Sequence, residues 1–235
     1  MKEDIPQISI ATADGGSFAA YLALPETTPA PAVICIQEVY GVNRFMRANT
    51  DFWASQGFVA ISPDIYWRLR SGVEFDPEVE GDGDRAMALA NELDRPQAVE
   101  DIAATIGHLR DMAQCTGKVG TTGYCLGGLL SYLIGTRHDA DCNIGYYPVG
   151  IENFLDEAER LNRPIMLHVG ESDPYTPPEV RAQLATALGS NALATIHCYP
   201  NIGHAFARPG APSHVPLAAD LANRRSAAFL RKHLA

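Results

Sequence analysis

A cysteine in a glycine-lined segment is the residue of this sequence best placed to do covalent chemistry. Residues 123–128 read Gly-Tyr-Cys-Leu-Gly-Gly, which has the spacing of a nucleophile elbow with Cys125 at the nucleophile's position. Such an elbow is a tight strand-to-helix turn, and its glycines let the strand, the turn and the helix approach closely. Residues 118–122 have the pattern of a short buried strand and 129–134 that of an apolar helix, as an elbow requires.

Three other interpretations of this segment compete with the elbow. Cys125 can be an inert small hydrophobe, as most buried free cysteines are. A dinucleotide-binding loop needs its glycines after the first strand and an acidic residue about 20 positions later, whereas this segment is mid-chain and Asp141 is near that distance by chance. A short-chain dehydrogenase also needs Tyr-x-x-x-Lys, which the sequence lacks, and a phosphate-binding loop needs Gly-Lys-Ser/Thr, which this turn lacks.

Two loops further along the chain offer an acid and a base. Asp173 follows the predicted strand 164–169, and His204 follows the predicted strand 194–199. Each alone has an ordinary interpretation, since Asp in a Gly/Pro turn normally stabilises the turn and His beside Gly normally lies on the surface. The order nucleophile, acid, histidine, each after a strand's carboxyl end, is that of an α/β-hydrolase triad. We therefore expect Cys125, Asp173 and His204 to act together.

The chemistry of thiol catalysis requires each of these groups. The thiolate is the attacking form, and a free thiol has a pKa of about 8.5. An imidazole within hydrogen-bond reach removes the proton, and a carboxylate behind it fixes the tautomer. The dipole of the helix after the elbow also favours a thiolate at Cys125. We expect the backbone N–H groups of Leu126 and Val39 to form the oxyanion hole.

Composition bounds the class of protein. A chain of 235 residues, 46% hydrophobic and 20% charged, suits one α/β domain with a large core, which we expect to span 1–235. The net charge of −10, without a basic run, argues against nucleic acid or an anionic membrane as a partner. Residues 1–6 lack the apolar core of a signal peptide. No continuous apolar stretch is close to the length of about 20 residues that is needed to span a bilayer. We expect a cytoplasmic monomer.

The cysteine pattern gives no framework for disulfides or metal. The five cysteines are scattered, with no Cys-x-x-Cys pair and no Cys/His cluster, so we expect neither a disulfide scaffold nor a zinc site. Cys35 and Cys198 lie in apolar strand patterns, which predicts core packing for both.

The elements that must position these residues alternate between strand and helix. This alternation predicts a mainly parallel central sheet with helices on both faces. An alternating segment that ends before Pro25 predicts an early, edge-like strand at 17–24. The connection 68–84 predicts a long surface excursion, functional or disordered, and the short link 150–163 leaves no room for a large lid domain. The other predicted strands are 31–36, 58–62, 143–147, 164–169 and 194–199, and the other predicted helices are 45–56, 98–112 and 216–234.

Four segments together resemble the dienelactone hydrolase family, whose activity is called carboxymethylenebutenolidase. The resemblance spans nearly the whole chain and implies an α/β-hydrolase fold, a Cys125–Asp173–His204 triad, and no metal or organic cofactor. It implies hydrolysis of a small anionic enol-lactone to a keto-carboxylate such as maleylacetate, in the degradation of aromatics and chloroaromatics. The four segments are 37–41 (Gln-Glu-Val-Tyr-Gly), 123–128, 145–147 (Gly-Tyr-Tyr) and 203–208 (Gly-His-Ala-Phe-Ala-Arg).

The same resemblance implies roles for three more side chains. Glu38 matches a glutamate that contacts the nucleophile and helps control when the thiol ionises. Arg208 and Arg85 match arginines that hold the substrate's carboxylate, and bidentate arginine pairing would supply the local positive charge that an acidic protein needs for this. The ordinary alternatives are a solvated helix-start residue for Arg85 and a capping or surface carboxylate for Glu38.

Two competing functions stay open at this point. A broader carboxylesterase or thioesterase on the same scaffold would act on neutral esters and depend little on Arg208. A redox-sensing module would use Cys125 as an oxidisable thiol and turn over no ester. Ala205 and Leu89 depart from the family pattern, which leaves the fine specificity open.

Overall fold

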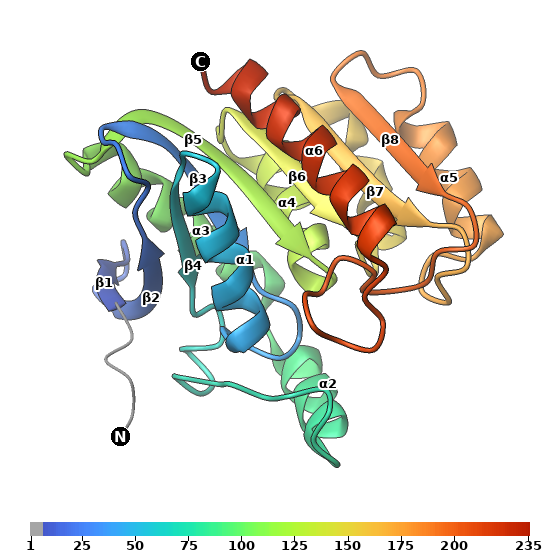
Figure 1. Cartoon of the computed structure of the whole chain (residues 1–235), viewed down its shortest axis with the longest axis horizontal. Helices are drawn as coiled ribbons and strands as arrows, with labels where there is room; N and C mark the ends of the chain where they lie inside the picture. The colour runs from blue at the N-terminus through green and yellow to red at the C-terminus, as the bar shows by residue number, and fades with distance from the viewer. Residues whose placement is uncertain (1–6) are drawn as a thin grey trace. The chain divides into compact units, whose positions relative to one another are not determined.

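Figure 1 shows the computed structural model of the chain, which describes residues 7–235. The charged start at residues 1–6 lies outside the described residues, so the prediction made for it stays a prediction. The chain divides into two compact units, residues 1–119 and residues 120–235, and the single-domain prediction also stays a prediction. None of the described helices is long and apolar enough to cross a membrane.

The first unit contains strands in the order β1-β2-β4-β3. β1 pairs with β2 and β2 with β4 in antiparallel fashion, whereas β3 and β4 run parallel, with Ile34 opposite Ile61. β3 and β4 are almost wholly buried, which explains their continuous apolar sequences. The strands are β1 (Gln7–Ala11), β2 (Ser17–Ala23), β3 (Ala30–Ile36) and β4 (Val59–Pro63).

The expected edge strand at 17–24 is an interior strand. β2 has β1 on one side and β4 on the other, so the predicted edge position is wrong. β1 is not predicted from the sequence, because it is short, largely exposed, and places only Ile10 fully in the core.

Helices α1 (Arg44–Ser55), α2 (Asp82–Glu92) and α3 (Arg95–Asp111) complete the first unit. α1 begins after Asn43, whose side-chain oxygen accepts hydrogen bonds from the N–H groups of Phe45 and Met46. A cap of this kind stabilises a helix by about 1 kcal/mol. The sequence did not predict α2, because its start lies inside the long polar connection.

The second unit contains a parallel sheet with the order β5-β6-β7-β8. In Figure 1 the arrows of these strands point the same way. The mainly parallel sheet predicted from the sequence is confirmed. The strands are β5 (Cys115–Tyr124), of which residues from Gly120 onward pair with β6, then β6 (Cys142–Tyr146), β7 (Ile165–Gly170) and β8 (Ala194–Tyr199).

Helices lie on both faces of this second sheet. Figure 1 shows α6 (Pro216–His233) crossing in front of β6 and β7, with α4 (Leu126–Arg137) behind them. α4 is buried over almost its whole length, as its uniformly apolar sequence requires. Between β6 and β7 the chain forms the short 3-10 segment η1 (Ile151–Arg160), and α5 (Pro178–Leu188) lies between β7 and β8. No lid domain is inserted between β6 and β7 in the described chain.

The sheet of the second unit positions the predicted chemistry. Because β5, β7 and β8 are parallel, their carboxyl ends lie at one edge of the sheet. Cys125 directly follows β5, Asp173 follows β7 and His204 follows β8. Residues distant in sequence therefore meet at this edge.

Cys198 departs from its predicted place in the core. It lies on β8, which among the described residues of this unit pairs only with β7, and its side chain is exposed. The prediction for Cys198 is therefore wrong, because β8 is largely half-buried or exposed even though its sequence is apolar. Cys35, predicted in the same way, is fully buried.

Candidate active site

Cys125 occupies the tight turn between β5 and α4. Its φ of 55° lies in the left-handed region, which costs a non-glycine residue about 1–3 kcal/mol. Its N–H donates to the carbonyl oxygen of Tyr146 at 3.0 Å. Gly123 is required because a Cβ there would overlap the carbonyl oxygen of Gly127. The segment 123–128 therefore folds as a strand-to-helix turn, with the Cys125 side chain only 8% exposed.

The structure brings Cys125, Asp173 and His204 together. Nδ1 of His204 lies 2.8 Å from Oδ2 of Asp173, which is buried. The side chain of Cys125 lies close enough to the same imidazole to raise its pKa. A thiol, an imidazole and a carboxylate thus lie together in the order in which a triad activates a nucleophile and moves its proton.

His204 is held in its charged form over a wide pH range. Burial by itself lowers the pKa of this imidazole, but the hydrogen bond with Asp173, the nearby Cys125 side chain and the charge of Asp173 raise it to about 10. At neutral pH the imidazolium is therefore ready to donate a proton to a leaving group.

The turn that presents Asp173 is built from its own sequence, Asp-Pro-Tyr-Thr. Oδ1 of Asp173 accepts the N–H of Tyr175 at 2.9 Å, and its carbonyl accepts the N–H of Thr176 at 3.1 Å. This is an Asx-turn within a β-turn, with proline where such turns favour it. The carboxylate therefore stabilises the turn with one oxygen and binds His204 with the other, so the two interpretations of Asp173 are compatible.

Arg181 fixes this turn to α5. Its guanidinium donates to the carbonyl oxygens of Glu171 at 3.0 Å and Thr176 at 2.7 Å, on either side of Asp173. We call residues 171–176 the acid turn. Sequence reasoning gave no role to Arg181, because nothing in a helical sequence pattern shows which loop carbonyls its side chain reaches.

The loop that carries His204 has its own supports. Ala205 adopts a left-handed φ of 58°. Its carbonyl accepts the hydroxyl of Ser213 at 3.1 Å, and the carbonyl of Phe206 accepts the N–H of Val215 at 2.9 Å. The return of the chain toward α6 thus holds the histidine loop in place.

Arg208 and Leu126 also lie in the second unit. Arg208 is buried, and its N–H donates to the carbonyl of Ala205 at 3.1 Å, so its backbone is tied to the histidine loop. Leu126 is the first residue of α4, and N–H groups at this position have no carbonyl partner inside the helix. It is therefore suited to act as an oxyanion donor.

Glu38 and Val39 lie in the first unit, directly after β3. Both are buried, and the carbonyl of Val39 accepts the hydroxyl of Tyr66 at 3.0 Å. Beside them, the side-chain oxygen of Gln37 accepts the N–H of Ile65 at 3.3 Å. Glu38 is therefore not a surface carboxylate. The functional roles of Glu38 and Val39 stay predictions.

Arg85 lies in the first turn of α2 in the first unit. Its guanidinium forms an ion pair with Asp82 and lies 5.3 Å from the ring centroid of Phe75. The Arg85 side chain is 59% exposed, whereas that of Asp82 is buried. Its place at a solvated helix start agrees with the ordinary alternative, and its role in substrate binding stays a prediction.

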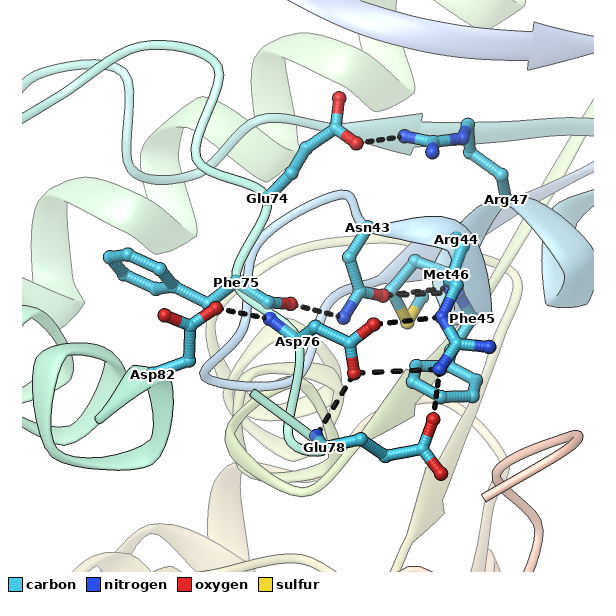
Figure 2. A network of polar contacts seen from close by, with 10 residues as sticks. All are labelled: Asn43, Arg44, Phe45, Met46, Arg47, Glu74, Phe75, Asp76, Glu78 and Asp82. Atoms are coloured by element: carbon cyan, nitrogen blue, oxygen red, sulfur yellow. Dashed lines mark hydrogen bonds and ion pairs between the residues drawn. The ribbon is translucent and has the colours of Figure 1, made fainter. Parts of the chain in front are cut away.

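The connection that precedes Arg85 is tied to the start of α1, as Figure 2 shows. We call residues 72–82 the tethered segment. Its carboxylates meet two arginines of α1, which are partly exposed. The ion pairs are Arg44 with Asp76 at 2.9 Å, Arg44 with Glu78, and Arg47 with Glu74 at 2.7 Å.

Backbone contacts complete this attachment (Figure 2). The side-chain amide of Asn43 donates to the carbonyl of Phe75 at 2.8 Å while its oxygen caps α1. The N–H of Asp76 donates to Oδ2 of Asp82 at 2.8 Å. The long connection is therefore a packed surface segment, whose order the sequence left open.

The remaining cysteines are placed as structural residues. Cys35, Cys115 and Cys142 are buried free thiols, and burial raises the pKa of Cys35 to about 12. Among residues 7–235, no cluster of three or more His, Cys, Asp or Glu side chains is arranged to hold a metal ion.

Comparison with known proteins places this geometry in a family. The model of the dienelactone hydrolase family matches residues 18–234. Carboxymethylenebutenolidase of Pseudomonas putida is 37% identical over 95% of this chain and 94% of its own length. Carboxymethylenebutenolidase 1 of Cupriavidus pinatubonensis is 36% identical over 95% of each chain. A solved structure from Klebsiella pneumoniae, described as a putative dienelactone hydrolase, superposes with a TM-score of 0.86 at 25% identity, over 96% of this chain and 97% of that one.

The fold is therefore that of the α/β-hydrolases, as the sequence predicted. More narrowly, the chain belongs to the dienelactone hydrolase family. It is a hydrolase of carboxylic esters or lactones.

Proposed function

We propose that this protein hydrolyses a small anionic enol-lactone, converting dienelactone to a maleylacetate-type keto-carboxylate. The observation that supports this most is the imidazole of His204, which is hydrogen-bonded to Asp173 at 2.8 Å and has the Cys125 side chain close enough to shift its pKa. The relatives named carboxymethylenebutenolidase support the choice of substrate. A step in the breakdown of aromatic or chloroaromatic compounds would supply such a lactone.

The reaction proceeds in two halves. The sulfur of Cys125 attacks the lactone carbonyl, the ring C–O bond breaks, and the enol oxygen leaves with a proton from His204. A water molecule then gives its proton to His204 and attacks the thioester carbonyl, and Cys125 is released as thiolate. Asp173 holds the imidazole in the required tautomer and stabilises its charge throughout.

Backbone and charged groups complete the proposed site. The N–H groups of Leu126 and Val39 stabilise the negative oxygen of each tetrahedral intermediate. Arg208 and Arg85 bind the substrate's carboxylate, because bidentate guanidinium pairing supplies local positive charge in an acidic protein. Glu38 controls the ionisation of the Cys125 thiol.

The first test removes the nucleophile. We expect Cys125→Ala to abolish turnover of 4-carboxymethylenebut-2-en-4-olide, measured by loss of the lactone's absorbance. Cys198→Ala is the matched control, because it removes an exposed thiol on β8 and should leave kcat unchanged. Turnover that survives in the Cys125 variant contradicts the proposed function.

A carboxylesterase acting on neutral esters is the second candidate. The ion pair between Arg85 and Asp82 favours it, because this guanidinium already has a carboxylate partner. Replacing Arg208 by alanine separates the two functions. Lactone hydrolysis predicts a rise in KM of about tenfold or more for the anionic lactone, as expected for a lost charge-assisted pair worth about 1.5–3 kcal/mol. If the protein is instead an esterase, the Arg208 variant and the parent should have equal kcat/KM for a neutral p-nitrophenyl ester. This ester should also be a better substrate than the anionic lactone.

A further inference from the structure

The imidazole of His204 contacts two tyrosine rings that have no part in the steps above. The ring of Tyr147 is 5.0 Å away and that of Tyr175 is 4.8 Å away, between centroids, with interplanar angles of 69° and 68°. Both contacts have the edge-to-face geometry that aromatic pairs favour. Tyr147 is fully buried, whereas Tyr175 is 48% exposed. Tyr175 is therefore the more exposed of the two rings that contact His204.

Core packing does not account for the position of Tyr175. A ring that keeps about half its surface in water gains little from burial, so its edge-to-face contact with His204 is the interaction that its position provides. The backbone here is rigid, because the N–H of Tyr175 is bonded to Asp173 Oδ1 at 2.9 Å and the following residue closes the β-turn. Arg181 then ties the turn to α5. The ring is thus held over the histidine by the same turn that presents the acid.

The geometry also links Tyr175 to the hydrogen bond between His204 and Asp173. One carboxylate oxygen accepts the imidazole Nδ1–H and the other accepts the backbone N–H of Tyr175. The Asp173 side chain is fully buried and that of His204 is 17% exposed, although the acid turn itself lies at the surface. A hydrogen bond between charged groups is stronger where water is kept away. Loss of the ring would expose this bond to more water.

We propose that Tyr175 is a positioning residue for the catalytic imidazole. Its ring fixes the plane of His204 and shields the His204–Asp173 hydrogen bond from water, and its backbone N–H orients the carboxylate. The role belongs to the ring rather than the hydroxyl, so phenylalanine should replace tyrosine. This inference rests on the proposed function only in assigning catalysis to His204, since the contact itself is structural.

The test compares Tyr175→Ala, Tyr175→Phe and Leu217→Ala. The last variant is the control, because it removes a side chain that is 84% exposed on α6. In Tyr175→Ala we expect kcat for the lactone to fall about tenfold with KM unchanged, because a misplaced catalytic group costs rate rather than affinity. We expect kcat of the Phe variant and of the control to stay within about twofold of the parent, a change of less than about 0.5 kcal/mol.

Proton NMR supplies a measurement that would not change if Tyr175 only stabilised the fold. The Nδ1–H of His204, bonded to Asp173, should give a low-field resonance, and its exchange with water should accelerate in Tyr175→Ala but not in Tyr175→Phe. Thermal unfolding checks that each variant is folded. Unchanged kcat and exchange in Tyr175→Ala would overturn the proposal, as would an equal loss in Tyr175→Phe or a change confined to KM.

These experiments distinguish a failure of the Tyr175 proposal from a failure of the proposed lactone hydrolysis. If the parent does not hydrolyse the lactone, the exchange measurement still tests whether Tyr175 shields the hydrogen bond. If Cys125→Ala retains turnover while Tyr175→Ala shows fast exchange, the proposed nucleophile is wrong and the shielding role of Tyr175 stands.

Discussion

The acid turn and the tethered segment are both held by arginines, but the arginines bind different partners. Arg181 donates to two neutral backbone carbonyls of the acid turn, at 3.0 and 2.7 Å. Arg44 and Arg47 instead meet carboxylates of the tethered segment, with the Arg44 side chain half exposed. One attachment has an acceptor that cannot titrate, and the other depends on charges in water.

This difference shows what each segment tolerates. Exposed ion pairs contribute about 0.2–1 kcal/mol each and weaken as salt is added. Hydrogen bonds from a guanidinium to carbonyls are not lost by protonation of the acceptor. The acid turn should therefore keep its geometry across pH and salt, whereas the tethered segment, and with it Arg85, should loosen as salt rises.

The largest expected effect comes from removing the charge in the acid turn. Asp173→Asn can still accept the N–H of Tyr175 and so keep the turn, but it no longer fixes the imidazole tautomer. We expect kcat to fall by about 10³–10⁴, as in other triads. The pKa of His204 should also fall, because Asp173 raises it; titration of the imidazole by NMR measures this. A kcat within tenfold of the parent would contradict the role of Asp173.

A smaller effect is expected from the arginine that holds the same turn. Arg181→Met removes two charge-assisted hydrogen bonds, and we expect the free energy of unfolding to fall by about 1.5–3 kcal/mol. The rate should fall because the acid turn loosens, and denaturant unfolding with kinetics at two salt concentrations measures both. The decrease in the free energy of unfolding should be the same at low and high salt. A decrease that depends strongly on salt would contradict the contrast between the acid turn and the tethered segment.

The pH dependence of stability is the next expected effect. The folded pKa of His204 is raised to about 10 from an ordinary 6.5. A raised pKa stabilises the folded state fully below pH 6.5, and this contribution is lost as pH rises through about 10. We expect the stability difference between the parent and Asp173→Asn to shrink over this window. Unfolding in urea at pH 6 and pH 10 measures it, and a difference that grows with pH would show the wrong sign.

The smallest effect is expected in the tethered segment. Arg44→Met should lower the free energy of unfolding by about 1 kcal/mol or less, because its ion pairs are exposed. If Arg85 binds the substrate's carboxylate, KM for the anionic lactone should rise about twofold, a small change in free energy. High salt should produce the same rise in the parent, whereas kcat and neutral-ester hydrolysis should be unaffected. Arg110→Met, which changes an arginine on α3, is the matched control.

The sequence predicted what periodicity and strand order encode. The buried strands and the long apolar helices were found because each has a strong pattern, and Cys125, Asp173 and His204 were grouped because parallel strands end at one edge. β1 and α2 were missed because one is short and half exposed and the other lies in a polar connection.

Supports that act through contacts across the fold could not be predicted. Arg181 and Tyr175 become visible only when α5 and the acid turn are seen together with the histidine loop. The left-handed backbone of Ala205 is likewise imposed by its surroundings, since alanine has no preference for it. The side chains that perform a reaction are thus easier to read from a sequence than those that hold them.

The exposed thiol on β8 has a practical consequence. Among the five free cysteines, Cys198 is the exposed one and Cys125 is 8% exposed. Cys198 is the thiol most accessible to a bulky maleimide, and at a pH high enough to ionise it, because burial raises its pKa, it gives one defined point for a fluorophore or for immobilisation on a surface. Counting titrated thiols would therefore overestimate the number of active sites, unless Cys198 is first replaced by serine.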